Sequence, residues 1–184
     1  MNFFLVTILQ VFWLLLPSAA ANIVPILVKN INFLNIPLDF NSLLWSRPLF
    51  GAHKTFRGFF FGILSALAVI LLQRMIESIT NIHGMLDYTA LSLSSLLLLG
   101  FLLGFGALVG DLIESFIKRR LVIKPGAPFF PFDQIDWILG SLFFASFVVQ
   151  LNLLFILVAL VLYGFLHPLA NLLGYYLKIK KNKF

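Results

Sequence analysis

The sequence predicts an all-α integral membrane protein, with about five transmembrane helices packed in one bundle. Of its 184 residues, 61% are hydrophobic and only 11% are charged, whereas an average soluble domain carries roughly 25% charged residues. Several apolar runs approach the ~20 residues that a helix needs to cross a bilayer. The basic residues gather between and after these runs, which is the pattern that sets orientation in a membrane.

Five apolar segments are the basis of this prediction, and we expect residues 1–184 to form a single membrane-embedded catalytic domain. The predicted spans cover residues 3–28, 59–79, 91–109, 137–149 and 153–177. The fourth span is short and only a few polar positions separate it from the fifth, so we expect the two to form a tight helical hairpin. We do not expect the first span to be a cleaved signal peptide, because no Lys or Arg precedes its apolar stretch.

The basic residues predict the orientation. With five spans, the segment between spans one and two, the segment between spans three and four, and the tail all fall on one side, which the positive-inside rule assigns to the cytoplasm. Their bases include Arg47, Lys54, Arg57, Lys118, Arg119, Arg120, Lys124, Lys178, Lys180, Lys181 and Lys183. We therefore expect a protein of the cytoplasmic membrane with its charged site on the cytoplasmic side. The lysine-rich tail is expected to lie on anionic lipid headgroups.

Four of the seven acidic residues lie where spans three and four meet the cytoplasm. Asp111 and Glu114 are spaced i, i+3 and would share one face of a helix, and Asp133 and Asp136 repeat the spacing. Carboxylates at a membrane edge are costly, so they usually have a partner or a function. A divalent cation would remove their mutual repulsion, and Mg²⁺ prefers such hard oxygen ligands, often with substrate phosphates. The alternative is that Glu114 and Lys118 form a local helix pair worth ~0.2–0.5 kcal/mol.

A second polar stretch, LFGAHKTFRGFFFG at residues 49–62, places Lys54, Thr55 and Arg57 between two glycines. Glycines allow the backbone to approach a ligand closely, and two bases with a hydroxyl supply donors for phosphate. The spacing is not that of a Walker loop. Acids for a metal and bases for phosphate together indicate a nucleotide or pyrophosphate site. An ordinary basic loop is the alternative.

The chain has no cysteine, which excludes disulfides, thiolate metal sites and cysteine nucleophiles.

Four short segments, in their order and spacing, carry a resemblance to a known family. They are ANIVP at residues 21–25, FGAHKTFRG at 50–58, GDLIESFIKRR at 110–120 and DQIDWILG at 133–140. Together they resemble the CDP-archaeol synthase family, which is related to the phosphatidate cytidylyltransferases. The third segment contains the G-D-x-x-x-S-x-x-K-R signature of the wider cytidylyltransferase superfamily, and the second and fourth are similar to its archaeol-type branch.

Three departures from the wider superfamily favour the archaeol-type branch. Pro125 follows Lys124 where an acid is usual, the Gly-His-Gly-Gly turn is absent, and Gln134 replaces an arginine between the two late aspartates. The resemblance implies a five-helix bundle with a polar cavity open to the cytoplasm. It also implies that CTP and a phosphorylated lipid, archaetidic-acid-like or phosphatidate-like, give a CDP-activated lipid and pyrophosphate. The lipid chain type and a preference for CTP or dCTP stay open.

The resemblance also implies roles for single residues. Asp111 and Asp133 match the family position by position and are the first candidates for Mg²⁺ ligands, followed by Asp136 and then Glu114. Lys118 would hold phosphate oxygens and, with those two aspartates, form the catalytic group. The expected substrate-binding residues are Lys54, Thr55, Arg57, Ser115, Arg119 and Asn22. Arg119 is alternatively a membrane anchor, and Asn22, near Pro25 in the first span, is alternatively an interhelical packing residue.

Two other functions compete with this prediction. A small ion or solute transporter could use the interfacial carboxylates to bind a moving ion, and a non-catalytic assembly protein would need no site at all. Transporters usually place such groups near the bilayer midplane, whereas here nearly all charge lies at one interface. The enzyme prediction is therefore favoured, with CTP, a phosphorylated membrane lipid and the membrane itself as partners, and no nucleic acid.

Overall fold

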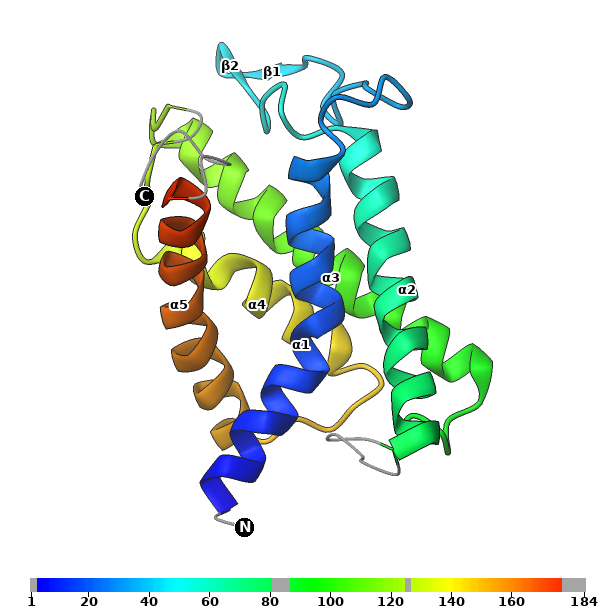
Figure 1. Ribbon diagram of the computed structural model, residues 1–184. Coiled ribbons are helices and arrows are strands. Elements are labelled where there is room, and N and C mark those ends of the chain that lie inside the picture. Colours follow the sequence, from blue (N-terminus) through cyan, green and yellow to red (C-terminus); the bar gives the residue numbers. More distant parts are fainter. Residues whose placement is uncertain (1–2, 81–86, 125–126, 177–184) are drawn as a thin grey trace.

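The computed structural model describes residues 3–80, 87–124 and 127–176, which form five helices and one small hairpin (Figure 1). The helices are α1 (Phe3–Leu27), α2 (Phe56–Thr80), α3 (Leu93–Arg120), α4 (Phe132–Ala145) and α5 (Leu153–Tyr176). The strands β1 (Leu43–Leu44) and β2 (Arg47–Pro48) pair antiparallel. The predicted all-α class is confirmed. The lysine-rich tail lies outside the described residues.

Three helices are long and apolar enough to cross a membrane. The apolar windows of α1, α2 and α3 have mean hydropathies of 2.0, 2.1 and 2.3. Among the described residues α5 is apolar over the shorter stretch Leu153–Leu166. Helix α4 has 14 residues and so spans about 21 Å at 1.5 Å per residue, which is less than the ~30 Å of a hydrocarbon core. The protein is therefore a membrane protein, and five complete crossings stay a prediction.

The ends of α3 and α4 differ from the predicted spans in a way that matters for the site. Helix α3 continues to Arg120, and α4 begins at Phe132, whereas the apolar runs predict an end at residue 109 and a start at 137. Hydropathy follows the membrane's interior, but a helix needs only its backbone hydrogen bonds and can run on into polar sequence. As a result, all four clustered acids lie on regular helix.

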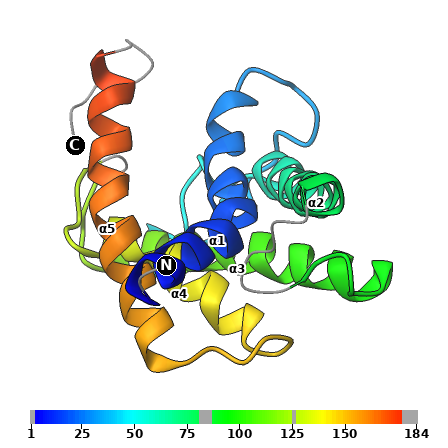
Figure 2. The same ribbon diagram turned by 60° about the horizontal axis from the view of Figure 1, so that its bottom comes forward.

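The core of the bundle lies where α1, α2, α3 and α4 meet. Leu14, Ile70, Leu103 and Ile138, one from each of these helices, are fully buried. The hydroxyl groups of Ser18 on α1 and Ser141 on α4 both donate to the backbone oxygen of Leu103, at 3.2 and 3.3 Å. Figure 2 shows α5 and α2 at opposite edges of the bundle, with α1 between them.

Glycines allow α3 and α4 to pack with their backbones in contact. A Cβ added to Gly110 would collide with the carbonyl oxygen of Asp136, and one added to Gly140 would collide with the carbonyl oxygen of Gly106. No residue with a side chain fits at these crossings without moving one helix. The close approach brings the first turns of α4 directly beside the charged end of α3.

The segment between α1 and α2 folds over the end of the bundle where α3 finishes and α2 starts, which we call the loop end (Figure 1). The buried carboxylate of Asp39 accepts hydrogen bonds from the backbone N–H groups of Asn41, Phe50 and Gly51, at 3.0–3.1 Å. Burial raises the pKa of Asp39, but these N–H donors outweigh it and hold the pKa below its usual value. One carboxylate thus joins the two ends of the loop that contains the hairpin.

The hairpin is also tied to the last residue of α3. The guanidinium group of Arg120 donates to the carbonyl oxygens of Leu44 and Pro48, both at 2.5 Å, and Arg47 donates back to the carbonyl oxygen of Arg120 at 3.0 Å. Arg120 also lies over the ring of Trp45, 5.8 Å from its centroid. This basic residue therefore serves as a structural connection at the loop end.

Candidate active site

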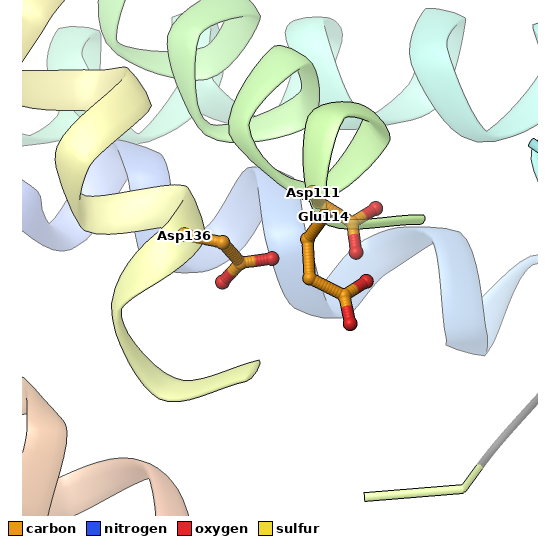
Figure 3. Close-up of side chains that lie close together, drawn as sticks. All are labelled: Asp111, Glu114 and Asp136. Atoms are coloured by element: carbon orange, nitrogen blue, oxygen red, sulfur yellow. The ribbon is translucent and has the colours of Figure 1, made fainter. Parts of the chain in front are cut away.

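Three carboxylates from α3 and α4 converge at the loop end. Asp111, Glu114 and Asp136 each offer one carboxylate oxygen, and these oxygens lie within 4.8 Å of one another (Figure 3). The first two share one face of α3 because they are three residues apart. Asp136 reaches them because α4 packs against Gly110. We call these three residues the carboxylate cluster.

The carboxylate cluster fits a hard divalent cation. Its donors are all carboxylate oxygens, which Mg²⁺ prefers. The buried Oδ1 atom of Asp136 has no hydrogen-bond partner among the described residues, and such an atom normally needs one. Glu114 is only 7% exposed. Carboxylates held this closely repel one another, and a bound cation would relieve that repulsion.

Asp133 stands beside the cluster and is connected to it by Lys118. The ammonium group of Lys118 pairs with Glu114 at 2.6 Å and also with Oδ1 of Asp133. The other oxygen of Asp133 accepts the backbone N–H of Phe129 at 2.5 Å. The local pair of Glu114 and Lys118 that the spacing allows is therefore present, but it belongs to a three-residue group. The assignment of Asp133 as a metal ligand stays a prediction.

Lys54 brings the loop between α1 and α2 to the carboxylate cluster. Its ammonium group pairs with Oδ2 of Asp111 at 2.5 Å. Its backbone is fixed by the N–H of Leu38, which donates to the carbonyl oxygen of Lys54 at 2.8 Å, and by its own N–H bond to Gly51 at 3.1 Å. Gly51 has a φ of +103°, a backbone conformation that glycine adopts without strain. The structure thus unites the second and third motif segments in space.

A cavity of about 560 Å³ lies next to this ion pair, between α1, α2, α3 and the loop. It is lined by predicted site residues from three motif segments, namely Asn22, Lys54, Thr55, Arg57 and Asp111. Asp111 therefore belongs both to the cavity wall and to the carboxylate cluster. A cavity of this size is in the range of small-molecule sites.

Thr55 and Arg57 also support the backbone around the cavity. The hydroxyl oxygen of Thr55 accepts the N–H of Gly58 at 3.3 Å, and the side chain of Arg57 donates to the carbonyl oxygen of Ile31 at 2.5 Å. The backbone N–H groups of Phe56 and Arg57 donate to loop carbonyls, at 3.0 and 2.8 Å. The N–H groups of Phe56 and Arg57 at the start of α2 are therefore already occupied by the loop.

The remaining predicted residues lie on α3, apart from the cavity lining. Ser115 is buried, and its hydroxyl lies 3.4 Å from the carboxylate of Glu114. Arg119 is also buried, and a Cβ on Gly51 would lie 4.0 Å from its Nη1 atom. The side chain of Arg119 therefore faces the loop rather than the lipid, unlike a membrane anchor.

Sequence reasoning missed four polar residues of the cavity wall: Lys29, Asn30, Asn35 and His53. His53 stands inside the second motif segment, next to Lys54. The signal that would have found Asn30 and Asn35 is the density of asparagine between the first span and that motif, in a chain that is otherwise apolar.

Comparisons with known proteins show the family of this chain. The family model described as CarS-like CDP-archaeol synthase matches residues 4–184. The CDP-archaeol synthase of Pyrococcus furiosus is 37% identical over 175 residues, covering 94% of this chain and 96% of that protein. The corresponding protein of Methanocaldococcus jannaschii is 35% identical over 169 residues, covering 91% of this chain and 92% of that protein.

A solved structure gives the same result at the level of the fold. It is described as an intramembrane enzyme for archaeal membrane lipid biosynthesis, and it superposes with a TM-score of 0.70 at 27% identity, covering 87% of this chain and 91% of that one. The family resemblance inferred from the four motif segments is confirmed. The chain belongs to the CDP-archaeol synthase family, and it is an enzyme of the CTP-dependent nucleotidyltransferase class.

Proposed function

We propose that this protein is a Mg²⁺-dependent cytidylyltransferase that condenses CTP with an archaetidic-acid-like or phosphatidate-like lipid on the cytoplasmic side of the membrane. The observation that carries the proposal is the position of Asp111, which lies in the wall of the 560 Å³ cavity and also in the carboxylate cluster. A nucleotide in that cavity would therefore have its phosphates next to the carboxylates. The names of the relatives favour an archaeol-type lipid over an acyl lipid.

The reaction requires alignment and charge neutralisation rather than a protein nucleophile. An oxygen of the lipid phosphate forms a new bond to the α-phosphorus of CTP, the bond between the α-phosphorus and its bridging oxygen breaks, and pyrophosphate leaves with the electron pair. A phosphate monoester is largely ionised near neutral pH, so no strong base is needed. Holding two anionic reactants in line is the main contribution of the protein.

The chain's own residues divide this work between two groups. Asp111, Glu114 and Asp136 would hold Mg²⁺, with Asp133 as a further candidate. When bound, Mg²⁺ would neutralise phosphate charge and orient the phosphate oxygens. The basic and hydroxyl side chains would bind the phosphate oxygens that the metal does not reach, and they are Lys54, Thr55, Arg57, Ser115, Lys118 and Arg119.

The cavity position of Asn22 supports a role in substrate binding. Asn22 lies on α1 one turn before Pro25, and both residues line the cavity. A polar residue is tolerated at this depth where it faces protein or a polar space. Its amide can donate and accept hydrogen bonds, which suits the floor of a nucleotide pocket.

The test is incorporation of radiolabel from CTP into lipid by the purified protein, with and without Mg²⁺. The panel of acceptors should contain a phosphorylated isoprenoid ether lipid, a phosphatidate and an unphosphorylated lipid as control. The proposal predicts Mg²⁺-dependent labelling of a phosphorylated acceptor with release of pyrophosphate. Absence of labelled lipid with every acceptor would overturn it. The relatives named above are lipid-biosynthesis enzymes, so the transport alternative has no support.

A further inference from the structure

Two lysines occupy carboxylate oxygens of the proposed metal site. Lys54 pairs with Asp111 at 2.5 Å, and Lys118 pairs with Glu114 at 2.6 Å and with Asp133. The two lysines come from different parts of the chain, one from the loop and one from the last turns of α3. Two of the three residues in the carboxylate cluster are therefore already neutralised by an ammonium group.

The charges at this site balance only in part. Asp111, Glu114, Asp133 and Asp136 supply four carboxylates, against which Lys54 and Lys118 supply two ammonium groups. The lysines thus stand where cationic charge is required. Asp136 is the member of the cluster to which no ammonium group is paired among the described residues, and its Oδ1 atom has no hydrogen-bond partner there.

We propose that Lys54 and Lys118 are exchangeable counter-ions of the carboxylate cluster, which leave it for phosphate oxygens when a metal–nucleotide complex enters. The inference rests on the proposed function, because it assumes that metal and triphosphate share this site. It adds to that function an explanation of how the two components depend on each other. On this proposal a phosphate oxygen takes the place of Asp111 as the partner of Lys54 and the place of Glu114 as a partner of Lys118.

The chemistry of lysine suits this exchange. Its ammonium group is a compact point charge on a flexible four-carbon stem, so it can move between neighbouring anions without a change in the backbone. Phosphate oxygens are strong acceptors for such a donor. Lys54 is well placed because its side chain is about one quarter exposed and lines the cavity. Lys118 is more deeply buried, at 10% side-chain exposure.

The exchange couples metal binding to nucleotide binding. A metal ion alone would have to compete with the ammonium groups. Lys54 would lose its carboxylate partner and Lys118 would lose one of its two, and Mg²⁺ is also slow to give up its water. A nucleotide supplies phosphate oxygens to the displaced lysines, which removes the free-energy cost of taking their ammonium groups away from the carboxylates. Because coupling between two ligands is reciprocal, the metal strengthens nucleotide binding by the same factor. The resting site is thus protected from adventitious divalent ions.

The experiment measures binding of Mn²⁺ alone to the full-length protein in lipid nanodiscs, by titration calorimetry or electron paramagnetic resonance, without CTP or lipid acceptor. Lys54→Met removes the ammonium group and keeps the length of the side chain. The proposal predicts that Lys54→Met and Lys118→Met bind Mn²⁺ about tenfold or more tightly than wild type, the change that corresponds to ~1.4 kcal/mol. Unchanged or weaker binding in both folded variants would overturn it.

A matched control distinguishes the effect of a direct ion pair between lysine and carboxylate from the effect of net charge near the cavity. Lys29 is exposed and lines the same cavity, and no carboxylate pairs with it among the described residues. Lys29→Met removes the same charge, and its effect on Mn²⁺ affinity should be several-fold smaller, because an exposed charge is screened by salt. An equal gain from Lys29→Met and Lys54→Met would assign the effect to net charge and overturn the inference.

A measurement on the wild type keeps the inference falsifiable if a variant does not fold. Acylation of lysines by an amine-reactive reagent, read by mass spectrometry, should label Lys54 faster at saturating Mn²⁺ than without metal, since the ammonium group has left Asp111. Lys54 labelling that Mn²⁺ does not change would overturn the exchange. The radiolabel assay tests the proposed function separately. Turnover by the wild type, together with no gain in Mn²⁺ affinity in the variants, would contradict this inference and leave the proposed function standing.

Discussion

Gly110 of α3 packs against the backbone carbonyl of Asp136 in α4, with no room between them for a Cβ atom. One position therefore sets both the separation of two helices and the distance between two carboxylates, because Asp111 follows Gly110 directly. The carboxylate cluster depends on the absence of a side chain as much as on the presence of acids.

Gly110→Ala should therefore remove activity by separating the cluster. The added methyl group requires α4 to move, which should lower the free energy of unfolding by ~1–3 kcal/mol and weaken Mn²⁺ binding in the same variant. Thermal unfolding and a Mn²⁺ titration measure the two effects. Gly164→Ala in α5 is the matched control, because nothing lies within 4 Å of a Cβ there. Normal metal binding by Gly110→Ala would contradict the role of this contact.

Asp111→Asn should abolish CTP-dependent product formation and leave the protein folded and inserted. The amide keeps the size of the side chain but removes the charge shared by the cavity and the cluster, and we expect a loss of about 100-fold or more in kcat. The measurement is radiolabelled CDP-lipid formation. Asp87→Asn, an exposed change in the segment before α3, serves as the control. Near-normal turnover in Asp111→Asn would remove the metal assignment.

Arg57→Ala should weaken substrate binding more than Arg120→Ala does. Arg57 lines the cavity, and losing a charged donor to phosphate corresponds to ~1.5–3 kcal/mol, or about 10–100-fold in KM for CTP. Arg120 holds the hairpin instead, so Arg120→Ala should mainly speed proteolysis of residues 40–50. Steady-state kinetics and limited proteolysis distinguish the two variants. Equal effects of the two substitutions on KM would contradict the assignment of Arg57 to substrate binding.

Asp39 predicts a dependence of loop order on pH. The pKa of Asp39 is lowered in the folded protein from its ordinary value of 3.8. The ionised carboxylate therefore stabilises the loop fully at pH values above the ordinary pKa, and this stabilisation is lost as the pH falls through the lower pKa of the folded protein. Hydrogen exchange of the Phe50 and Gly51 amides, corrected for intrinsic rates, should therefore show that these amides lose protection once the pH is lower than ~4. Asp39→Asn should reduce this protection at neutral pH and abolish its titration. A variant whose protection still falls in acid would assign the titration to another group.

Local spacing predicted part of the arrangement of the acidic residues, and non-local packing decided the rest. The i, i+3 rule placed Asp111 and Glu114 on one face of α3, and both belong to the cluster. Whether Asp133 or Asp136 joins them depends on how α4 rotates against α3, which Gly110 and Gly140 fix through contacts between helices. No pattern within one helix contains that information.

The loop between α1 and α2 depends even more on contacts between distant residues, which local sequence patterns do not predict. Residues of the loop and of the start of α2 reach the cavity only because Leu38 bonds to Lys54 and Arg57 bonds to Ile31. These contacts join positions that are 16 and 26 residues apart. Hydropathy likewise marks only the apolar part of α3, because polar sequence can continue a helix beyond the apolar run when its charged side chains find partners on one face.

The occupied N–H groups at the start of α2 have a consequence for how the family can diversify. Many phosphate sites rely on backbone amides at a helix terminus, which a point mutation cannot delete. Here the amides of Phe56 and Arg57 already bond to the loop, so under the proposed function the phosphate donors would be side chains, which a point mutation can replace. We therefore expect single substitutions of those side chains to alter which phosphorylated substrate binds while the backbone of the loop and of α2 stays unchanged.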